Sequence, residues 1–316
     1  MKRLGRGRPI AMTTPGSAVT GPRPWVTYAV IALLSTIWGS TYFVIRAGLE
    51  DLPPFTGATV RFCLACGLMA GLARVLAGRE GGGRPTTTMS LIMGLFNFGV
   101  GYGVVYWAET ILPSGLVSVL WAVFPMMMAV STHWFLPGER LHLRQWGGFL
   151  VGFCGVALLF ATDLANLGPR AIPAGLVLLL SPAASAVAHT YIKRNGAAVS
   201  SLLLNRNGMA IGALALAAMA VLRERDAPVQ WTAQAVGSVV YLAVVGTTLT
   251  FGLYFWVLRH TPAYRLSVIS YLTPVLALTV GAVAGGEPVG LPTIAGVAMI
   301  TSGVGLVMIK RKPATS

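Results

Sequence analysis

Runs of about 20 consecutive apolar residues recur along almost the whole 316-residue chain. Each run, as a helix, is long enough to cross a hydrocarbon core of roughly 30 Å. Only 10% of the residues are charged, whereas soluble domains carry about 25%. The sequence therefore predicts one all-α polytopic membrane protein.

Turn-forming residues divide the apolar runs into ten expected membrane-spanning helices. The breaks include residues 51–54, 81–83 and 168–169, which are rich in proline and glycine. The expected helices are 26–47, 55–77, 89–108, 112–136, 146–162, 173–193, 201–222, 234–258, 264–285 and 291–309.

The basic residues predict the orientation of these helices. A net charge of +14 is compatible with nucleic-acid binding, but the Lys and Arg residues lie in short loops and tails. If both termini are cytoplasmic, 17 of the 23 Lys and Arg residues fall in cytoplasmic segments and four in outer loops. By the positive-inside rule, we expect a multi-pass inner (plasma) membrane protein with both termini in the cytoplasm and no nucleic-acid partner.

The second half of the chain repeats the first at an offset of 148 or 149 positions. Matching pairs include Pro113 and Pro262, Ser118 and Ser267, Pro125 and Pro274, and Gly138-Glu139 and Gly286-Glu287. Because each repeat holds five expected helices, the second copy should be inverted in the membrane. Inverted repeats around a site at the membrane midplane are typical of secondary transporters.

The repeat divides the chain into four expected parts. Residues 1–24 are rich in Arg, Gly and Pro, and we expect a disordered basic tail there. Residues 25–165 and 166–310 should form the two five-helix repeats, and residues 311–316 a C-terminal tail. Small-residue pairs such as Gly67 and Gly71 or Gly148 and Gly152 should let helices approach closely. These pairs are compatible with a monomer and with a homodimer.

Aromatic and polar side chains fall near the centres of several expected helices. Trp38 and Trp121 are central, whereas other tryptophans lie near helix ends, as an interfacial belt requires. A central indole needs a partner for its N–H group. Such stripes serve either as polar contacts between helices or as the lining of a cavity for a small molecule. The candidate substrate-binding residues are Trp38, Tyr42, Asn97, Tyr102, Ser118, Trp121, His189, Tyr254 and Tyr271.

Two prolines at matching repeat positions, Pro125 and Pro274, fall in the middle of expected helices. Each should free a carbonyl and bend its helix. We therefore expect them to act as kinks in the gates of alternating access.

Ionisable residues are scarce at membrane depth. All nine carboxylates fall at helix ends or in loops, which argues against proton-driven transport by a buried carboxylate. Arg61 and Arg206 occupy similar places in the two repeats. We expect them to reach toward lipid head groups, or else to contact carbonyls or an anionic substrate group. For His189 we favour packing or substrate contact over a proton relay.

The residues together resemble the EamA-type transporters of the drug/metabolite transporter (DMT) superfamily, over nearly all of 26–309. The matching features are Trp38-Gly39, Arg61-Phe62, Tyr106-Trp107-Ala108 and Gly138-Glu139. Within that family the chain looks most like YddG-type exporters of aromatic amino acids and methionine. The resemblance implies a basket of five plus five helices around a central cavity. It also implies the candidate residues listed above.

These observations predict a transporter that exports aromatic or bulky neutral amino acids by alternating access, as an uncoupled facilitator. A drug, nucleotide or sugar phosphate is the alternative substrate class. A membrane-embedded enzyme is a remote alternative, because no nucleophile–base set or metal cluster stands out. We expect no cofactor and no metal. The partners are a small-molecule substrate and the lipid bilayer.

Overall fold

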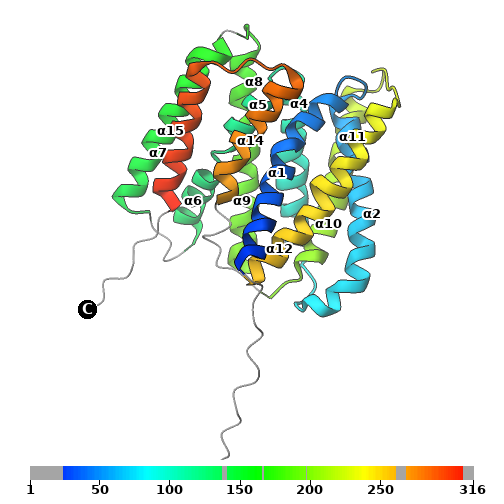
Figure 1. Ribbon diagram of the computed structural model, residues 1–316. Coiled ribbons are helices and arrows are strands. Elements are labelled where there is room, and N and C mark those ends of the chain that lie inside the picture. Colours follow the sequence, from blue (N-terminus) through cyan, green and yellow to red (C-terminus); the bar gives the residue numbers. More distant parts are fainter. Residues whose placement is uncertain (1–23, 137–140, 166, 197, 261–267, 309–316) are drawn as a thin grey trace, which may run out of the picture.

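A computed structural model describes residues 24–136, 141–165, 167–196, 198–260 and 268–308 (Figure 1). In this part of the chain the structure is helical, apart from an isolated parallel bridge between Gly83 and Val199. The all-α prediction is therefore confirmed. The helices are α1 (Pro24–Gly48), α2 (Pro54–Glu80), α3 (Thr87–Ile92), η1 (Met93–Gly101), α4 (Tyr102–Ala108), α5 (Ser114–Trp121), α6 (Phe124–Phe135), α7 (Leu143–Leu159), η2 (Phe160–Leu164), α8 (Ala171–Leu178), α9 (Leu180–Asn195), α10 (Ser201–Arg223), α11 (Ala233–Ala243), η3 (Val244–Leu249), α12 (Thr250–His260), α14 (Val268–Gly285) and α15 (Leu291–Met308).

Among the described residues, eight helical stretches are long and apolar enough to cross a membrane. Two shorter apolar helices, Leu272–Gly285 and Leu291–Leu306, follow them. Each of the ten expected helices thus has a counterpart, although within the described residues only the first eight meet the length of a spanning helix. The multi-pass prediction is confirmed, and the count of ten spans stays a prediction.

Several stretches change helix type along their length. The third passes through the π-helical segment η1, and the eighth passes through η3. These two segments lie at matching places in the two halves of the chain. A π-helical turn re-aims the side chains that follow it and is frequent at functional sites.

The two repeat-related prolines have different local structures. Pro125 is the second residue of α6, directly after the break that separates α5 from α6. A proline in the first helical turn leaves no hydrogen bond unmade. Pro274 lies inside α14, as expected. The fourth stretch is thus interrupted just before its proline, whereas the ninth stays one helix.

Helices of the first half pack mainly against helices of the second half (Figure 1). α7 and α15 form one side of the bundle, α2 packs on α10 at the opposite side, and α1 packs on α14 between them. The pairs recur when each helix is exchanged for its repeat counterpart. The α1–α14 pair then becomes the α9–α6 pair, and the pairs of α3 and η1 with α10 become the pairs of α11 and η3 with α2. The first described residue of α1 and the last of α15 lie toward the same end of the bundle.

Two carboxylates tie α2 and α10 together reciprocally. Glu80, the last residue of α2, accepts a hydrogen bond from the N–H of Ser201 at the start of α10, at 3.1 Å. Glu224, which follows α10, accepts bonds from the N–H groups of Phe55 and Thr56 at the start of α2, at 2.8 and 2.7 Å. Carboxylates satisfy free N–H groups and the positive end of a helix dipole. The two helices are therefore antiparallel, each capped by the other.

Glycine allows the backbones of α7 and α15 to touch. A Cβ atom on Gly303 would lie 2.6 Å from the Gly148 carbonyl oxygen, and one on Gly155 would lie 2.8 Å from the Gly296 carbonyl oxygen. This expected seam is therefore used inside one chain. The expected seam at Gly67 and Gly71 is different, because a Cβ at either position would meet nothing within 4 Å.

Candidate functional site

Five of the nine predicted substrate-binding residues fall into three separate groups at contacts between helices. The first is the Trp38 pair, in which the rings of Trp38 on α1 and Tyr254 on α12 lie 5.7 Å apart at 48°. Ile31, Leu34 and Ile269 belong to the small apolar cluster against which this pair packs. The pair therefore joins the first, eighth and ninth stretches.

The second group, which we call the Arg61 cluster, surrounds a cation that is only 1% exposed. Arg61 Nε and one terminal nitrogen donate to Thr247 Oγ1 at 3.2 and 3.1 Å. Its guanidinium carbon lies 5.0 Å from the ring centre of Tyr102 and 5.2 Å from that of Phe62. The other terminal nitrogen donates to the Tyr106 hydroxyl at 3.4 Å. Arg61 thus points into the protein, and the prediction that it reaches toward head groups is wrong.

Arg206, the repeat counterpart of Arg61, has a simpler environment. It is half-buried and donates to the side-chain oxygen of its neighbour Asn207 at 3.1 and 2.8 Å. Asn207 in turn donates to Ser90 Oγ at 3.3 Å. The two arginines therefore differ in burial and partners, although the repeat places them alike.

The third group, the Trp121 cluster, supplies the partner that a central indole needs. Trp121 Nε1 donates to Ser181 Oγ at 3.0 Å, and Ser181 Oγ donates to the Gly101 carbonyl oxygen at 2.7 Å. The Trp121 ring stacks on Phe124 with 5.0 Å between centres. Phe124 meets His189 edge to face at 5.5 Å. This cluster joins α5, α6 and α9.

His189 also contacts its own helix. Its Nδ1 atom lies 2.7 Å from the Ser185 carbonyl oxygen, one turn earlier in α9. Ring packing on Phe124 together with this backbone contact fits a histidine that packs or touches a substrate. As a hydrogen bond this contact places a proton on Nδ1, because a carbonyl oxygen can only accept.

The remaining predicted residues are buried or outside the described side chains. Asn97 is 5% exposed within η1. Ser118 is buried and donates to the Gly115 carbonyl oxygen at 2.7 Å, and Tyr42 is buried in the main apolar core. The side chain of Tyr271 lies outside the described residues, although its backbone belongs to α14.

Sequence reasoning missed Ser181 and Phe124. Ser181, Ser185 and His189 recur every four residues, which places them on one face of α9. That spacing was the available signal for Ser181. Phe124 had no such signal, because an aromatic residue in an apolar run is usually a lipid or core contact.

Charged groups gather at the end of the bundle that contains Gly48, Glu109, Ser114, Glu224 and Glu287, which we call the Glu287 end. There, Glu287 accepts hydrogen bonds from the N–H groups of Ser114 and Gly115 at 2.7 and 2.8 Å. Arg46 at the end of α1 donates to the Glu109 carbonyl oxygen. These contacts hold α1, α5 and the loop after α14 together.

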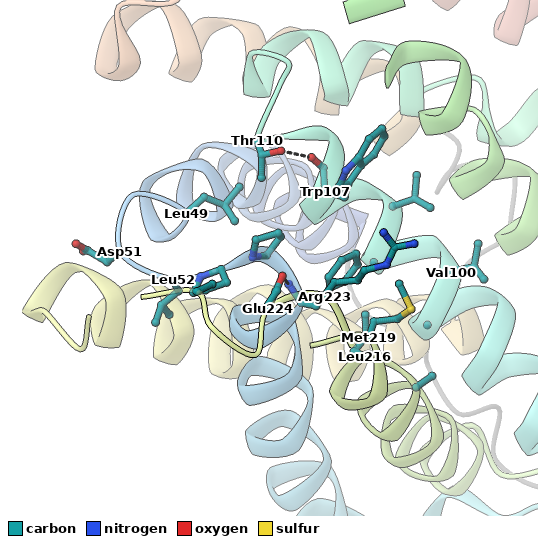
Figure 2. A pocket seen from close by; sticks show the side chains of 18 of the residues that line it. Leu49, Asp51, Leu52, Val100, Trp107, Thr110, Leu216, Met219, Arg223 and Glu224 are labelled. Carbon is teal, nitrogen blue, oxygen red and sulfur yellow. Dashed lines mark hydrogen bonds between the residues drawn. The ribbon is translucent and has the colours of Figure 1, made fainter. Parts of the chain in front are cut away.

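An open groove of about 1010 Å³ lies at the Glu287 end, beside η1, α4 and α10. Figure 2 shows Trp107, Val100, Leu216 and Met219 among its largely apolar walls, with Arg223 at the end of α10. None of the candidate residues whose side chains are described lines this groove. The groove is therefore separate from the three aromatic clusters.

Comparison with known proteins gives a family match over both halves. The EamA-like transporter family matches residues 25–161 and again residues 172–309. The relatives include the "Uncharacterized transporter YoaV" of Bacillus subtilis (strain 168), 27% identical over 279 residues, which are 87% of this chain and 94% of YoaV. They also include the "Uncharacterized inner membrane transporter YedA" of Escherichia coli (strain K12). YedA is 29% identical over 263 residues, 82% of this chain and 83% of its own length.

A solved crystal structure has a similar fold. It superposes with a TM-score of 0.63 at 22% sequence identity, over 90% of this chain and 96% of the other. At that identity the likeness concerns the fold alone. The family match to each half and the apolar helices of this chain support a repeated, all-helical membrane protein.

Proposed function

This chain belongs to the EamA-like transporter family, and we propose that it exports aromatic or bulky neutral amino acids across the inner membrane. The observation that carries the proposal is the placement of the Trp38 pair and the Trp121 cluster. Both are half-buried at contacts between helices of the two halves. Aromatic faces next to a few polar groups suit a small, partly apolar substrate.

The architecture we propose is a five-plus-five inverted repeat with ten spans and both termini in the cytoplasm. Three observations support it: the family matches each half, helix pairs recur on exchange of the halves, and Glu80 and Glu224 cap each other's helices. Inverted repeats usually place the substrate at their interface, near the membrane midplane.

In this proposal the polar and apolar parts of the substrate meet different side chains. The rings of Trp38 and Tyr254 contact its apolar side chain. Asn97, Ser118 and His189 contact its amino and carboxylate groups. Tyr42, Tyr102, Trp121 and Tyr271 complete the candidate set.

The gates of the proposed cycle lie in the fourth and ninth stretches. Pro125 follows the break between α5 and α6, and Pro274 lies within α14. Both stretches are anchored at the Glu287 end, where Glu287 binds the start of α5. Alternate bending at these prolines would open one end of the bundle while the other stays closed.

The test is flux of radiolabelled phenylalanine in proteoliposomes, measured with and without a pH gradient. We expect flux down the amino-acid gradient alone. Trp38→Ala should raise the KM at least about tenfold, since a ring contact and its buried area are lost. The matched control is Trp134→Ala, because Trp134 is 71% exposed at the end of α6. No flux of any amino acid by the wild type would refute the proposed substrate.

A phosphate-bearing metabolite is the second candidate. Arg61 favours it, because this buried cation has hydroxyl and aromatic partners but no carboxylate partner among the described residues. A drug is the third member of this alternative class. Competition by unlabelled sugar phosphates, nucleotides and drugs in the same flux assay separates these classes.

A further inference from the structure

Glu109 is buried without a hydrogen-bond partner for its carboxyl group. It is 0% exposed, and both carboxyl oxygens lack a partner among the described residues. An ionised carboxylate in that position would have lost its water without gaining a donor, which is strongly unfavourable. Such a group normally takes up a proton instead.

The charged neighbours of Glu109 form hydrogen bonds with groups other than its carboxyl group. Arg46 donates to the Glu109 carbonyl oxygen, and more weakly to the Leu112 carbonyl oxygen at 3.4 Å. Arg61 donates to Thr247. Glu287 already accepts from the start of α5. The titratable and charged groups that face Glu109 are Tyr42 and Arg46 on α1, Arg61 on α2, Tyr106 on α4 and Glu287 after α14.

Burial and the surrounding charges together also favour the protonated form of the Glu109 carboxyl group. Glu109 lies one residue beyond the span Thr87–Ala108. Burial raises the pKa of its carboxyl group well above the ordinary value, and the Glu287 carboxylate raises this pKa further. Arg46 and Arg61 lower the pKa, but they do not offset the burial. The closed arrangement therefore favours a protonated Glu109.

Glu109 lies in a connection that helps to close the Glu287 end, so protonation of its carboxyl group and closure of that end are linked. Glu109 begins the connection from α4 to α5. The Glu109 carbonyl is bound by α1 through Arg46, and the far side of the connection is bound by Glu287. Separating α1, α5 and the loop after α14 would break these contacts and admit water to the carboxyl group. In water a glutamate has a pKa of about 4.3.

We infer that Glu109 is a proton-binding site that keeps the Glu287 end of the transporter closed while it is protonated and favours opening when it is ionised. The inference rests on the alternating access proposed above. Under the proposed topology this is the outer end. The proton binds and leaves on the same side, so no proton crosses the membrane and transport stays uncoupled.

The sign of the pH effect follows from linkage. The closed state binds the proton more tightly than the open state. Between the ordinary carboxyl value and the raised value, each unit rise in pH shifts the equilibrium about tenfold toward the open state. Below the ordinary value both states are protonated, and the pH dependence ends. Acid outside the cell should therefore slow export.

The first experiment reads the carboxyl group directly. Infrared spectra of the purified protein at about pH 7 should show the C=O band of a protonated carboxyl group in wild type. The band should be absent in Glu109→Gln. It should persist in the control Glu50→Gln, because Glu50 is exposed at the same end. A wild-type spectrum without this band would overturn the proposal whatever the substrate is.

The second experiment measures whether protonation of Glu109 controls the rate of transport. Flux in proteoliposomes is measured while the outside pH is varied and the inside pH is fixed. Wild type should slow as the outside becomes acidic, whereas Glu109→Gln should stay slow at every pH, since glutamine mimics the neutral form. Glu109→Leu is a second neutral variant in case the amide misfolds. An unchanged pH profile in either folded variant would overturn the gate.

The outcomes of the two experiments distinguish a failure of the proposed function from a failure of the proposed proton site. If wild type transports no amino acid, the proposed function fails, and the infrared band still decides whether Glu109 holds a proton. If transport occurs and the band is present, the pH profiles alone decide whether the proton controls the gate.

Discussion

The Arg61 side chain is buried, and its guanidinium bonds to Thr247, which lies 186 positions away in sequence. A long cation can extend to the lipid head groups or turn into the protein. For Arg61 the acceptor that Thr247 supplies decides this, because it satisfies the cation inside the bundle.

Replacing Arg61 tests this difference at the residue scale. Arg61→Ala should lower the free energy of unfolding in detergent by about 2–4 kcal/mol, because it leaves a cavity and removes the partner of two buried hydroxyls. Arg206→Ala is the matched control. It should cost less than about 1 kcal/mol, since Arg206 is only half-buried and bonds its own neighbour. Equal losses in a denaturant titration would contradict the inward role of Arg61.

The burial of Glu109 could not be predicted from the sequence, because it too depends on distant segments of the chain. Its place at a helix end suggested exposure, and the expectation that buried carboxylates play no part rested on that position. Its burial depends on segments distant in sequence, such as α1, whose Arg46 binds the Glu109 carbonyl oxygen in the folded chain. The expected lack of ion coupling stays a prediction. The chain does, however, contain a buried carboxyl group.

The same carboxyl group makes the stability of the fold depend on pH. Its pKa is raised on folding, so its ionisation destabilises the folded state as pH rises above the unfolded value of about 4.3. Glu109→Gln should therefore raise the melting temperature at about pH 8 and change it little at about pH 4. Melting curves at both pH values check this. A lower melting temperature at pH 8 would contradict the unpaired burial of this group.

At the scale of helices, the apolar runs predicted nearly every element, because length and hydropathy are local properties of the chain. The break at residues 122–123 lies just before Pro125, where the sequence predicted a bend. The π-helical segment η1, in contrast, has no sequence signature. The sequence also does not predict which glycine pairs form helix contacts, because that depends on which helices pack together.

Two glycine substitutions test the helix contacts. Gly303→Ala should destabilise the protein by about 1–3 kcal/mol, because its Cβ would press on the α7 backbone. Gly71→Ala, in open space on α2, should be neutral or should stabilise by up to about 1 kcal/mol through helix propensity. Thermal unfolding of both variants in one detergent is the measurement. A harmless Gly303→Ala would mean that α7 and α15 are not in backbone contact.

At the scale of the whole molecule, the repeat offset indicated both the duplication and its inversion. The family matches confirm the duplication, since each half matches separately. The ten-span topology and the orientation stay predictions. They depend on whether α14 and α15 cross the membrane and on the termini, which lie outside the described residues.

Labelling of the termini tests the topology. Epitopes placed at both ends of the chain should be protected together in intact cells and accessible together after permeabilisation, because ten spans return the chain to its starting side. The control is an epitope inserted after Ala227, between α10 and α11, which should be accessible from outside. Termini on opposite sides would exclude an even number of spans.

The exchanged caps of α2 and α10 have a consequence for the two halves as separate molecules. A lone first half would present the start of α2 at the membrane surface without acceptors for the N–H groups of Phe55 and Thr56, which Glu224 binds in the whole protein. The second half, inserted upside down, would satisfy them through the same carboxylate. Cut after residue 165 and produced as two polypeptides, the protein should therefore reassemble without its covalent link.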